Sequence, residues 1–202
     1  MKTNLKRYCN LFDDTPIMLT QEKAEQILQT ADLIYSAEKI EQVVQRLADE
    51  ITVKLSGQYP LVLCVMKGAA VFAGHLLPKL TFPLNFDYVQ VSRYHNATSG
   101  GEIDWLMWPQ NNLQNRSVLV IDDILDEGVT LAAIQKQVLE SGARSFYAAV
   151  LADKDIGKIK PFQADFVGLK LPNRYVFGFG MDIYGAWRNL PAIYALQSEA
   201  GK

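Results

Sequence analysis

The chain has 202 residues, of which 49% are hydrophobic and 21% charged, a composition typical of a single soluble globular domain. Its formal net charge of −2 argues against a global positive field that would attract nucleic acid. The longest apolar run, residues 61–66, is far too short to span a bilayer, and no signal peptide is recognisable. The two cysteines form no disulfide framework, so we expect a cytoplasmic protein with no membrane and no nucleic-acid partner.

Two helices are predicted before the first strand. Thr20 is expected to cap a short helix that ends near Gln29, and Ser36 is expected to cap a longer one. The longer helix carries apolar residues at helical spacing: Ile40, Val43, Val44, Leu47, Ile51 and Leu55. This pattern predicts packing against a core rather than a binding surface.

Residues 61–66 are uniformly apolar, which predicts a strand buried on both faces. Lys67 and Gly68 follow, and a helix begins near Val71. An ammonium group, open backbone amides and a helix N-terminus can together bind a diphosphate. The signal is weak by itself, because many turns between a strand and a helix contain Lys-Gly.

A second strand is predicted from Leu84 to Val91. Its alternation of apolar and polar residues shifts phase at Val89, which suggests a bulge or a change from half-covered to covered. Residues 92–102 are polar and contain glycine, as an exposed hairpin loop would, and residues 103–107 alternate as a returning strand.

The most informative stretch is residues 118–130. Four apolar residues predict a buried strand, two acids are expected to end it, and a helix follows and ends at Ser141-Gly142. One acid in the turn would only cap the helix. The three aspartates Asp122, Asp123 and Asp126 within five residues instead indicate a ligand or metal, because crowded like charges disfavour one another.

Further strands are predicted at residues 146–151 and 166–169. Lys154 follows the first of them, although most lysines in such positions are simply solvated. The aromatic, glycine-spaced block 174–182 is typical of a strand with tight backbone packing.

Three blocks of this sequence resemble type I phosphoribosyltransferases, in the right order within residues 60–196. Residues 118–130 resemble the signature for phosphoribosyl pyrophosphate (PRPP), two acids and two apolar residues before Asp-Thr-Gly-x-Thr, with Glu127 in place of the first Thr. Met66-Lys67-Gly68-Ala69 resembles the Leu-Lys-Gly-Gly of purine salvage enzymes of the hypoxanthine-guanine type. Residues 174–188 resemble their basic-aromatic-Val-Val-Gly, Asp-Tyr, Arg pattern, with Ile183 in place of Tyr.

The resemblance implies an α/β protein with the type I phosphoribosyltransferase fold, a central, mostly parallel sheet flanked by helices. Residues 1–202 would form a single domain, with a core of about 36–170 and a small hood from about 1–35 and 171–202. The family also implies a homodimer or homotetramer. A non-proline cis peptide bond is expected at Lys67-Gly68.

The implied reaction is a pentosyl transfer from PRPP to hypoxanthine or guanine, with Mg²⁺ as cofactor and Asp126 as proton acceptor. The resemblance assigns PRPP and diphosphate binding to Lys67, Gly68, Arg188 and Tyr94. It assigns ribose-phosphate binding to Asp122, Asp123, Asp126, Glu127, Gly128, Val129 and Thr130. It assigns purine binding to Lys154, Tyr175, Val176 and Asp182. It assigns magnesium to Asp122, Asp123 and Asp182.

The resemblance leaves the roles of a few residues and the identity of the base open. Residues 92–102 would form the loop that closes over substrates, with Arg93 in place of the usual Ser. We expect the Glu127 side chain to turn outward, away from a bound phosphate. The alternatives are a phosphoribosyltransferase for xanthine or another base, and a PRPP-sensing regulator of the same fold that binds nucleic acid.

Overall fold

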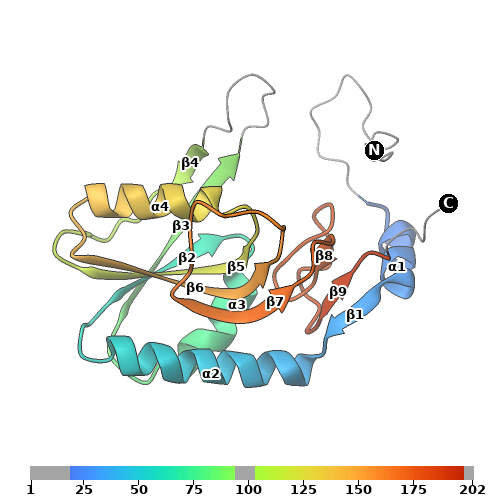
Figure 1. Cartoon of the computed structure of the whole chain (residues 1–202), viewed down its shortest axis with the longest axis horizontal. Coiled ribbons are helices and arrows are strands. Elements are labelled where there is room, and N and C mark those ends of the chain that lie inside the picture. Colours follow the sequence, from blue (N-terminus) through green and yellow to red (C-terminus); the bar gives the residue numbers. More distant parts are fainter. Residues whose placement is uncertain (1–18, 94–102, 198–202) are drawn as a thin grey trace.

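The computed structural model describes residues 19–93 and 103–197 of the chain (Figure 1). Its helices are α1 (Gln21–Thr30), α2 (Ala37–Leu55), α3 (Ala70–Leu76), the 3₁₀ helix η2 (Leu77–Lys79) and α4 (Val129–Glu140). Its strands are β1 (Asp32–Tyr35), β2 (Leu61–Met66), β3 (Asn85–Arg93), β4 (Ile103–Met107), β5 (Ser117–Leu125), β6 (Ser145–Lys154), β7 (Phe166–Leu171), β8 (Val176–Phe177) and β9 (Ile193–Ala195). Within these ranges, none of the helices has both the length and the apolar character needed to cross a bilayer.

The main sheet has six strands in the order β4-β3-β2-β5-β6-β7. Only β4, the return from β3, runs antiparallel, so the predicted α/β fold with a mostly parallel sheet is confirmed. The pairing of β3 with β4 is irregular between Gln90 and Val91, close to the predicted bulge.

The predicted helix caps and apolar stripe are present. The Thr20 hydroxyl oxygen accepts the Lys23 backbone N–H, and the Ser36 hydroxyl oxygen accepts that of Lys39, each at 3.4 Å. All six residues of the α2 stripe are buried, and α2 packs on β6 and β7. Figure 1 shows α4 on one side of the sheet and α2 with α3 on the other, so both faces are covered.

A second sheet, which we call the hood sheet, has three antiparallel strands in the order β1-β9-β8. Arg174, just before β8, connects the other two strands, because its guanidinium donates to the Asp32 carboxylate in β1 and to the carbonyl oxygen of Leu196, just after β9. The indole N–H of Trp187 donates to the Ala24 carbonyl in α1 at 2.7 Å. Segments from both ends of the described chain therefore form one unit beside the main sheet (Figure 1), while the domain limits near residues 36 and 170 stay predictions.

The arrangement of β2 and β5 determines where a ligand can bind. These neighbouring strands are parallel, but β2 leads through α3 to β3 on one side, whereas β5 leads through α4 to β6 on the other. At such a switch point the connections diverge and leave a crevice beyond the carboxyl ends of the strands. The acidic turn after β5 and the Lys67-Gly68 turn after β2 both lie there.

The strand β5 is longer than predicted. Asp122 and Asp123 were expected to end it, but it continues to Leu125 because its pairing with β6 continues through Ile124–Ala152 and Leu125–Asp153. The neighbouring strand, rather than local polarity, sets this end. As a result, Asp122 and Asp123 are held in a regular backbone, and Asp126 is the first aspartate beyond it.

Candidate active site

Asp122 and Asp123 lie at the switch point, beside the turn after β2. Asp122 is buried and accepts the Asp123 backbone N–H at 3.0 Å, while Asp123 accepts the Ile124 N–H at 2.9 Å. The Asp123 carboxylate lies so close to the Gly68 Cα that an added Cβ there would collide with it. Burial raises the pKa of Asp123, although hydrogen bonds and the charge of Arg188 act in the opposite direction.

The turn after β2 contains a non-proline cis peptide bond, but it joins Met66 and Lys67 rather than Lys67 and Gly68 as expected. The motif locates the turn without specifying which of its bonds is cis. Gly180, from the segment after β8, has a positive φ of 102° and packs against the Gly68 carbonyl, leaving no room for a Cβ. The C-terminal segment therefore supports the turn that carries Lys67.

Arg188 and Asp182 meet close to the same turn. One guanidinium nitrogen of Arg188 lies 2.5 Å from the Asp182 carboxylate, and another donates to the Gly180 carbonyl at 2.7 Å. The second carboxylate oxygen of Asp182 accepts the Gly185 N–H at 2.7 Å. A guanidinium has five N–H donors, more than these two contacts use, so Arg188 can also bind an anion.

Asp126 and Lys154 come from adjacent strand ends and are in contact. The Lys154 ammonium donates to the Asp126 carboxylate at 3.2 Å, and the lysine side chain is 14% exposed against 43% for the aspartate. Nearby, the Tyr175 ring stacks on Tyr184 with a centroid separation of 6.2 Å, and its hydroxyl donates to the Asp182 carbonyl at 3.4 Å. Burial and the charge of Asp182 raise the pKa of Tyr175, so this ring is neutral at physiological pH.

These groups surround a cleft of about 210 Å³, smaller than the roughly 300–1,000 Å³ of pockets for drug-sized ligands. Its lining combines acids, one lysine, an aromatic ring and apolar groups: Asp123, Ile124, Asp126, Lys154, Tyr175, Val176, Met181 and Asp182. Six of the eight are residues that the sequence singled out. The cleft can therefore hold a small planar ligand between a ring and a set of hydrogen-bonding groups.

The turn from Asp126 to Thr130 leads into α4. Gly128 caps the helix with a φ of 81°, in the left-handed region that glycine adopts without strain. The N-terminus of α4 follows this turn directly, and a helix N-terminus attracts anions. Glu127 is exposed, as expected.

Within the described residues, the carboxylates of this site do not form a metal centre made of protein side chains alone. In the part of the chain that the structure describes, no three His, Cys, Asp or Glu side chains form a cluster that could hold a metal. Mg²⁺ is commonly held by one or two carboxylates, with substrate phosphates and water as its other ligands. The donor set here fits that mode of binding.

Two predicted residues cannot be placed at the site, and three residues at or near it were not predicted. Tyr94 lies outside the described residues, and Arg93 is described only as the last backbone position of β3. Conversely, Ile124 and Met181 line the cleft, and Lys160 reaches the ends of β5 and β6, without a motif to mark them. Only the apolar character of Ile124 and Met181, next to predicted aspartates, could have suggested their place.

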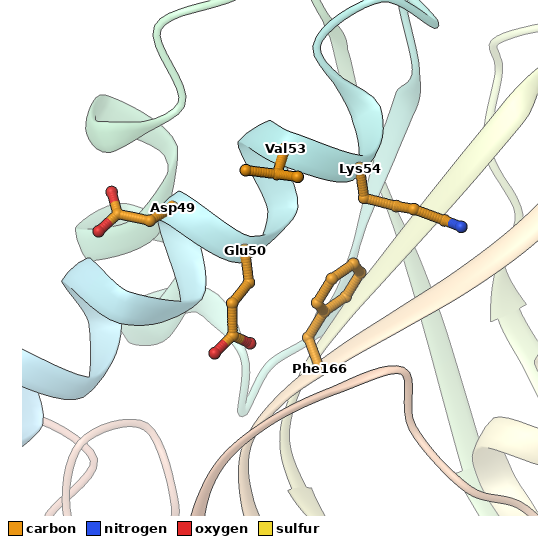
Figure 2. Close-up of a pocket in the computed structure, with 5 residues that line it drawn as sticks. All are labelled: Asp49, Glu50, Val53, Lys54 and Phe166. Carbon is orange, nitrogen blue, oxygen red and sulfur yellow. The ribbon is translucent and has the colours of Figure 1, made fainter.

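A different hollow of about 560 Å³ lies on the outer side of α2, against Phe166 at the start of β7 (Figure 2). Its polar side chains already have partners, because Glu50 pairs with Arg46 at 2.6 Å and the Lys54 ammonium lies 5.5 Å from the centre of the Tyr147 ring. It contains none of the residues that the sequence singled out. The cleft at the switch point is the better candidate for chemistry.

Comparison with known proteins identifies the class. Residues 30–184 match the phosphoribosyl transferase domain. The match covers most of the chain, and the chain belongs to this family.

Individual relatives support the same family. A hypoxanthine-guanine phosphoribosyltransferase from Streptococcus mutans is 34% identical over 168 residues, 83% of this chain and 93% of that protein. The bifunctional protein TilS/HprT of Listeria monocytogenes is 35% identical over 168 residues, so the chain spans 26% of the length of that relative. A solved hypoxanthine phosphoribosyltransferase from Staphylococcus aureus has a TM-score of 0.80 and 28% identity, over 85% of this chain and 95% of that one.

Proposed function

We propose that this protein transfers the 5-phosphoribosyl group of PRPP to hypoxanthine or guanine and releases the nucleoside monophosphate and pyrophosphate. The observation that carries the proposal is the contact between Asp126 and Lys154, in the cleft that Tyr175 and Val176 also line. It places an acid and an ammonium next to an aromatic ring at the switch point of a phosphoribosyltransferase fold. The names of the relatives support the same reaction.

The base binds in the cleft. Tyr175 stacks on the purine, and the backbone of Val176 contacts its edge. The Lys154 ammonium donates to the 6-oxo oxygen, and because an ammonium has no acceptor, it favours a 6-oxopurine over the 6-amino group of adenine. The cleft thus reads the oxygen that hypoxanthine, guanine and xanthine share.

Asp126 accepts the proton from the imidazole ring of the purine as the other ring nitrogen attacks the anomeric carbon. The bond from this carbon to the diphosphate breaks, and the diphosphate leaves with the bonding electrons. The aspartate is 43% exposed and lies 3.2 Å from the Lys154 ammonium, so it is held at the cleft without being sealed from substrate. Positioning and charge stabilisation account for most of the rate in such a displacement.

PRPP occupies the other side of the site. Asp122 and Asp123 accept the ribose hydroxyls, and the segment from Glu127 to Thr130 binds the 5′-phosphate through backbone amides and the Thr130 hydroxyl. Lys67, Gly68 and Arg188 bind the diphosphate, and the resemblance assigns Tyr94, which lies outside the described residues, to the same group. The contacts of Gly68 with Asp123 and Gly180 support this arrangement, because they join the three segments involved.

Mg²⁺ is part of the proposal. Asp122 and Asp123 would hold it together with PRPP oxygens. Asp182, whose carboxylate contacts Arg188 directly, would hold a second ion through water. When bound, the ion neutralises the charge that develops on the leaving diphosphate. Burial of Asp123 supports this role, since a cation would stabilise its charged form.

We also propose that the protein is a cytoplasmic homodimer or homotetramer. The buried free thiol of Cys64 suits a reducing compartment. Several large apolar side chains are 39–53% exposed on β3 and β4, which suits a surface that another copy covers: Phe86, Tyr88, Leu106 and Met107. Light scattering of the purified protein and of Leu106→Asp tests this assembly, and a monomeric wild type would overturn it.

A spectrophotometric assay with PRPP and Mg²⁺ tests the reaction. We expect turnover with hypoxanthine, guanine or both, and none with adenine. Xanthine is assayed beside them, because turnover with xanthine alone would change the substrate and keep the reaction. The absence of turnover with all three 6-oxopurines would overturn the proposed function.

A further inference from the structure

Lys160 lies in the connection between β6 and β7, close to the cleft but outside its lining. Its side chain is 11% exposed, although lysine is among the residues least often buried. The ammonium makes three short contacts, to the Leu125 carbonyl at 2.7 Å, the Lys154 carbonyl at 2.6 Å and the Asp153 carboxylate at 2.5 Å. A buried ammonium with this many partners is a built feature rather than a solvated surface charge.

The positions of the two carbonyls are informative. Leu125 immediately precedes Asp126, and the second carbonyl belongs to Lys154 itself. The last paired residues of β5 and β6 are Leu125 and Asp153, so Lys160 joins the two strands where their pairing ends. It connects the backbone of the proposed proton acceptor to the backbone of the proposed base-binding lysine.

The contacts also use the whole bonding capacity of the group. An ammonium has three N–H donors and no acceptor, and three acceptors surround this one. A further hollow of about 620 Å³ lies beside Lys160, but its ammonium has no donor to spare for a ligand there. Its role is therefore exerted through the residues that it holds.

Asp153 offsets the charge of Lys160. Burial alone would raise the pKa of Asp153, but hydrogen bonds from Lys160 and Lys170 outweigh it and lower that pKa. The connection also packs on the acidic turn, because a Cβ added at Gly128 would lie 3.4 Å from the Lys160 Cβ and 3.5 Å from the Phe162 Cβ. Lys160 is thus fixed on several sides.

We infer that Lys160 is a positioning residue for the base half of the reaction, which sets the separation of Asp126 and Lys154 by holding the two strand ends together. The inference rests on the proposed function, because it assigns Lys160 to the alignment of the base rather than to the binding of PRPP. Its loss should therefore affect the two substrates differently. A residue that only stabilised the fold would affect both alike.

The test uses Lys160→Met, which keeps most of the aliphatic side chain and removes the ammonium. Lys170→Met is the matched control, because Lys170 contacts the same Asp153 carboxylate at the same 2.5 Å but is 73% exposed. We expect kcat/KM for hypoxanthine to fall by about ten- to a hundredfold in Lys160→Met. The KM for PRPP should change less than about twofold, and Lys170→Met should match the wild type in both.

Two further variants keep the test decisive. Lys160→Arg restores donors at this position and should recover part of the lost base-dependent activity. Asp153→Asn keeps an acceptor but removes its charge, and should show the same selective defect to a smaller extent. If Lys160→Met does not fold, the result for Asp153→Asn decides, and a normal kcat/KM for hypoxanthine in that variant overturns the inference.

The outcomes distinguish a failure of the role of Lys160 from a failure of the proposed function. Wild-type kinetics in Lys160→Met would overturn the inference, as would equal losses for hypoxanthine and PRPP together with a lower melting temperature. An inactive wild-type protein would instead overturn the proposed function. An active wild type with a selective base defect in Lys160→Met supports both.

Discussion

The proposed PRPP half of the site, around Gly68, Asp122 and Asp123, differs in electrostatics from the proposed base half, around Asp126 and Lys154. In the PRPP half, the Asp123 carboxylate lies against the Gly68 backbone, and burial raises its pKa. In the base half, Asp126 contacts Lys154, and Asp153 contacts both Lys160 and Lys170 and has a lowered pKa. The base half is electrostatically balanced within the protein, whereas the PRPP half contains a carboxylate whose charge is disfavoured.

This difference predicts how ligand binding would affect the energetics of each half. Under the proposed function, a planar base would enter a cleft in which the acid and the lysine are already in contact, so little reorganisation would be needed on binding. In the PRPP half, hydroxyl donors or a bound cation would stabilise the Asp123 carboxylate and offset the cost of its burial. Binding there should therefore increase the stability of the protein as well as form the complex.

Replacing Asp126 tests the base half and should have the largest effect. Asp126→Asn keeps the shape of the side chain but cannot accept the purine proton, so kcat should fall by about 10²–10⁴-fold. The affinity for PRPP should stay within about threefold, because the PRPP half is unchanged. Steady-state kinetics and calorimetric titration measure the two quantities, and an unchanged kcat would remove Asp126 from its assigned role.

Adding a methyl group at Gly68 tests the PRPP half. In Gly68→Ala the new Cβ displaces the Asp123 carboxylate, so kcat/KM for PRPP should fall by about ten- to a hundredfold. Gly74→Ala is the control, since a Cβ there meets nothing within 4 Å, and alanine in α3 should stabilise by about 0.5–1 kcal/mol. Equal kinetics in the two variants would show that the close approach of Gly68 and Asp123 has no role in PRPP binding.

The opposite pKa shifts predict opposite effects on stability. Because folding raises the pKa of Asp123, its contribution is complete below the unfolded pKa of about 3.9 and is lost as pH rises through the folded pKa. Asp123→Asn should therefore raise the melting temperature of the ligand-free protein at pH 7 by a few degrees, about 2–4 °C.

Asp153→Asn should do the reverse. The lowered pKa of Asp153 gives stability that is present above pH 3.9 and is lost as pH falls through the folded pKa. This variant should melt at a lower temperature than the wild type at pH 7, with the gap closing on acidification. Scanning calorimetry from pH 3 to 8 compares the pair, and shifts of the same sign in both would contradict the contrast between the halves.

Glu127→Thr should have the smallest effect. The side chain of Glu127 is exposed, so its carboxylate should contribute little to phosphate binding, and threonine would remove a negative charge near the PRPP half. We expect the PRPP affinity to stay the same or to tighten by up to about threefold, as measured by titration. A large loss of affinity would mean that the carboxylate has a function of its own.

Local patterns were sufficient to predict most of the main sheet and its helices. The caps at Thr20 and Ser36, the apolar runs of β2 and β5, and the left-handed Gly142 after α4 each depend on neighbouring residues. The position of the site could also be predicted, because the motif residues occur where strands end and parallel strands bring those ends together. Functional roles for these residues stay predictions.

The remaining features depend on partners that are distant in sequence. The four residues of β1 carry no clear alternation, and the strand exists because it pairs with β9, with Asp32 opposite Ala195. The contact of Gly180 with Gly68 and the three contacts of Lys160 likewise join separate segments. No periodicity marks such positions, so only the three-dimensional structure shows them.

Trp187, whose indole N–H donates to the Ala24 carbonyl, can also serve as an internal fluorescent reporter. The chain has three tryptophans, and the other two, Trp105 and Trp108, pack edge to face with ring centroids 4.9 Å apart in and just after β4. A variant with phenylalanine at both of those positions would emit from Trp187 alone. Because Trp187 directly precedes Arg188 and its indole N–H is held by α1, its emission would follow the docking of the first helix against the arginine segment in real time.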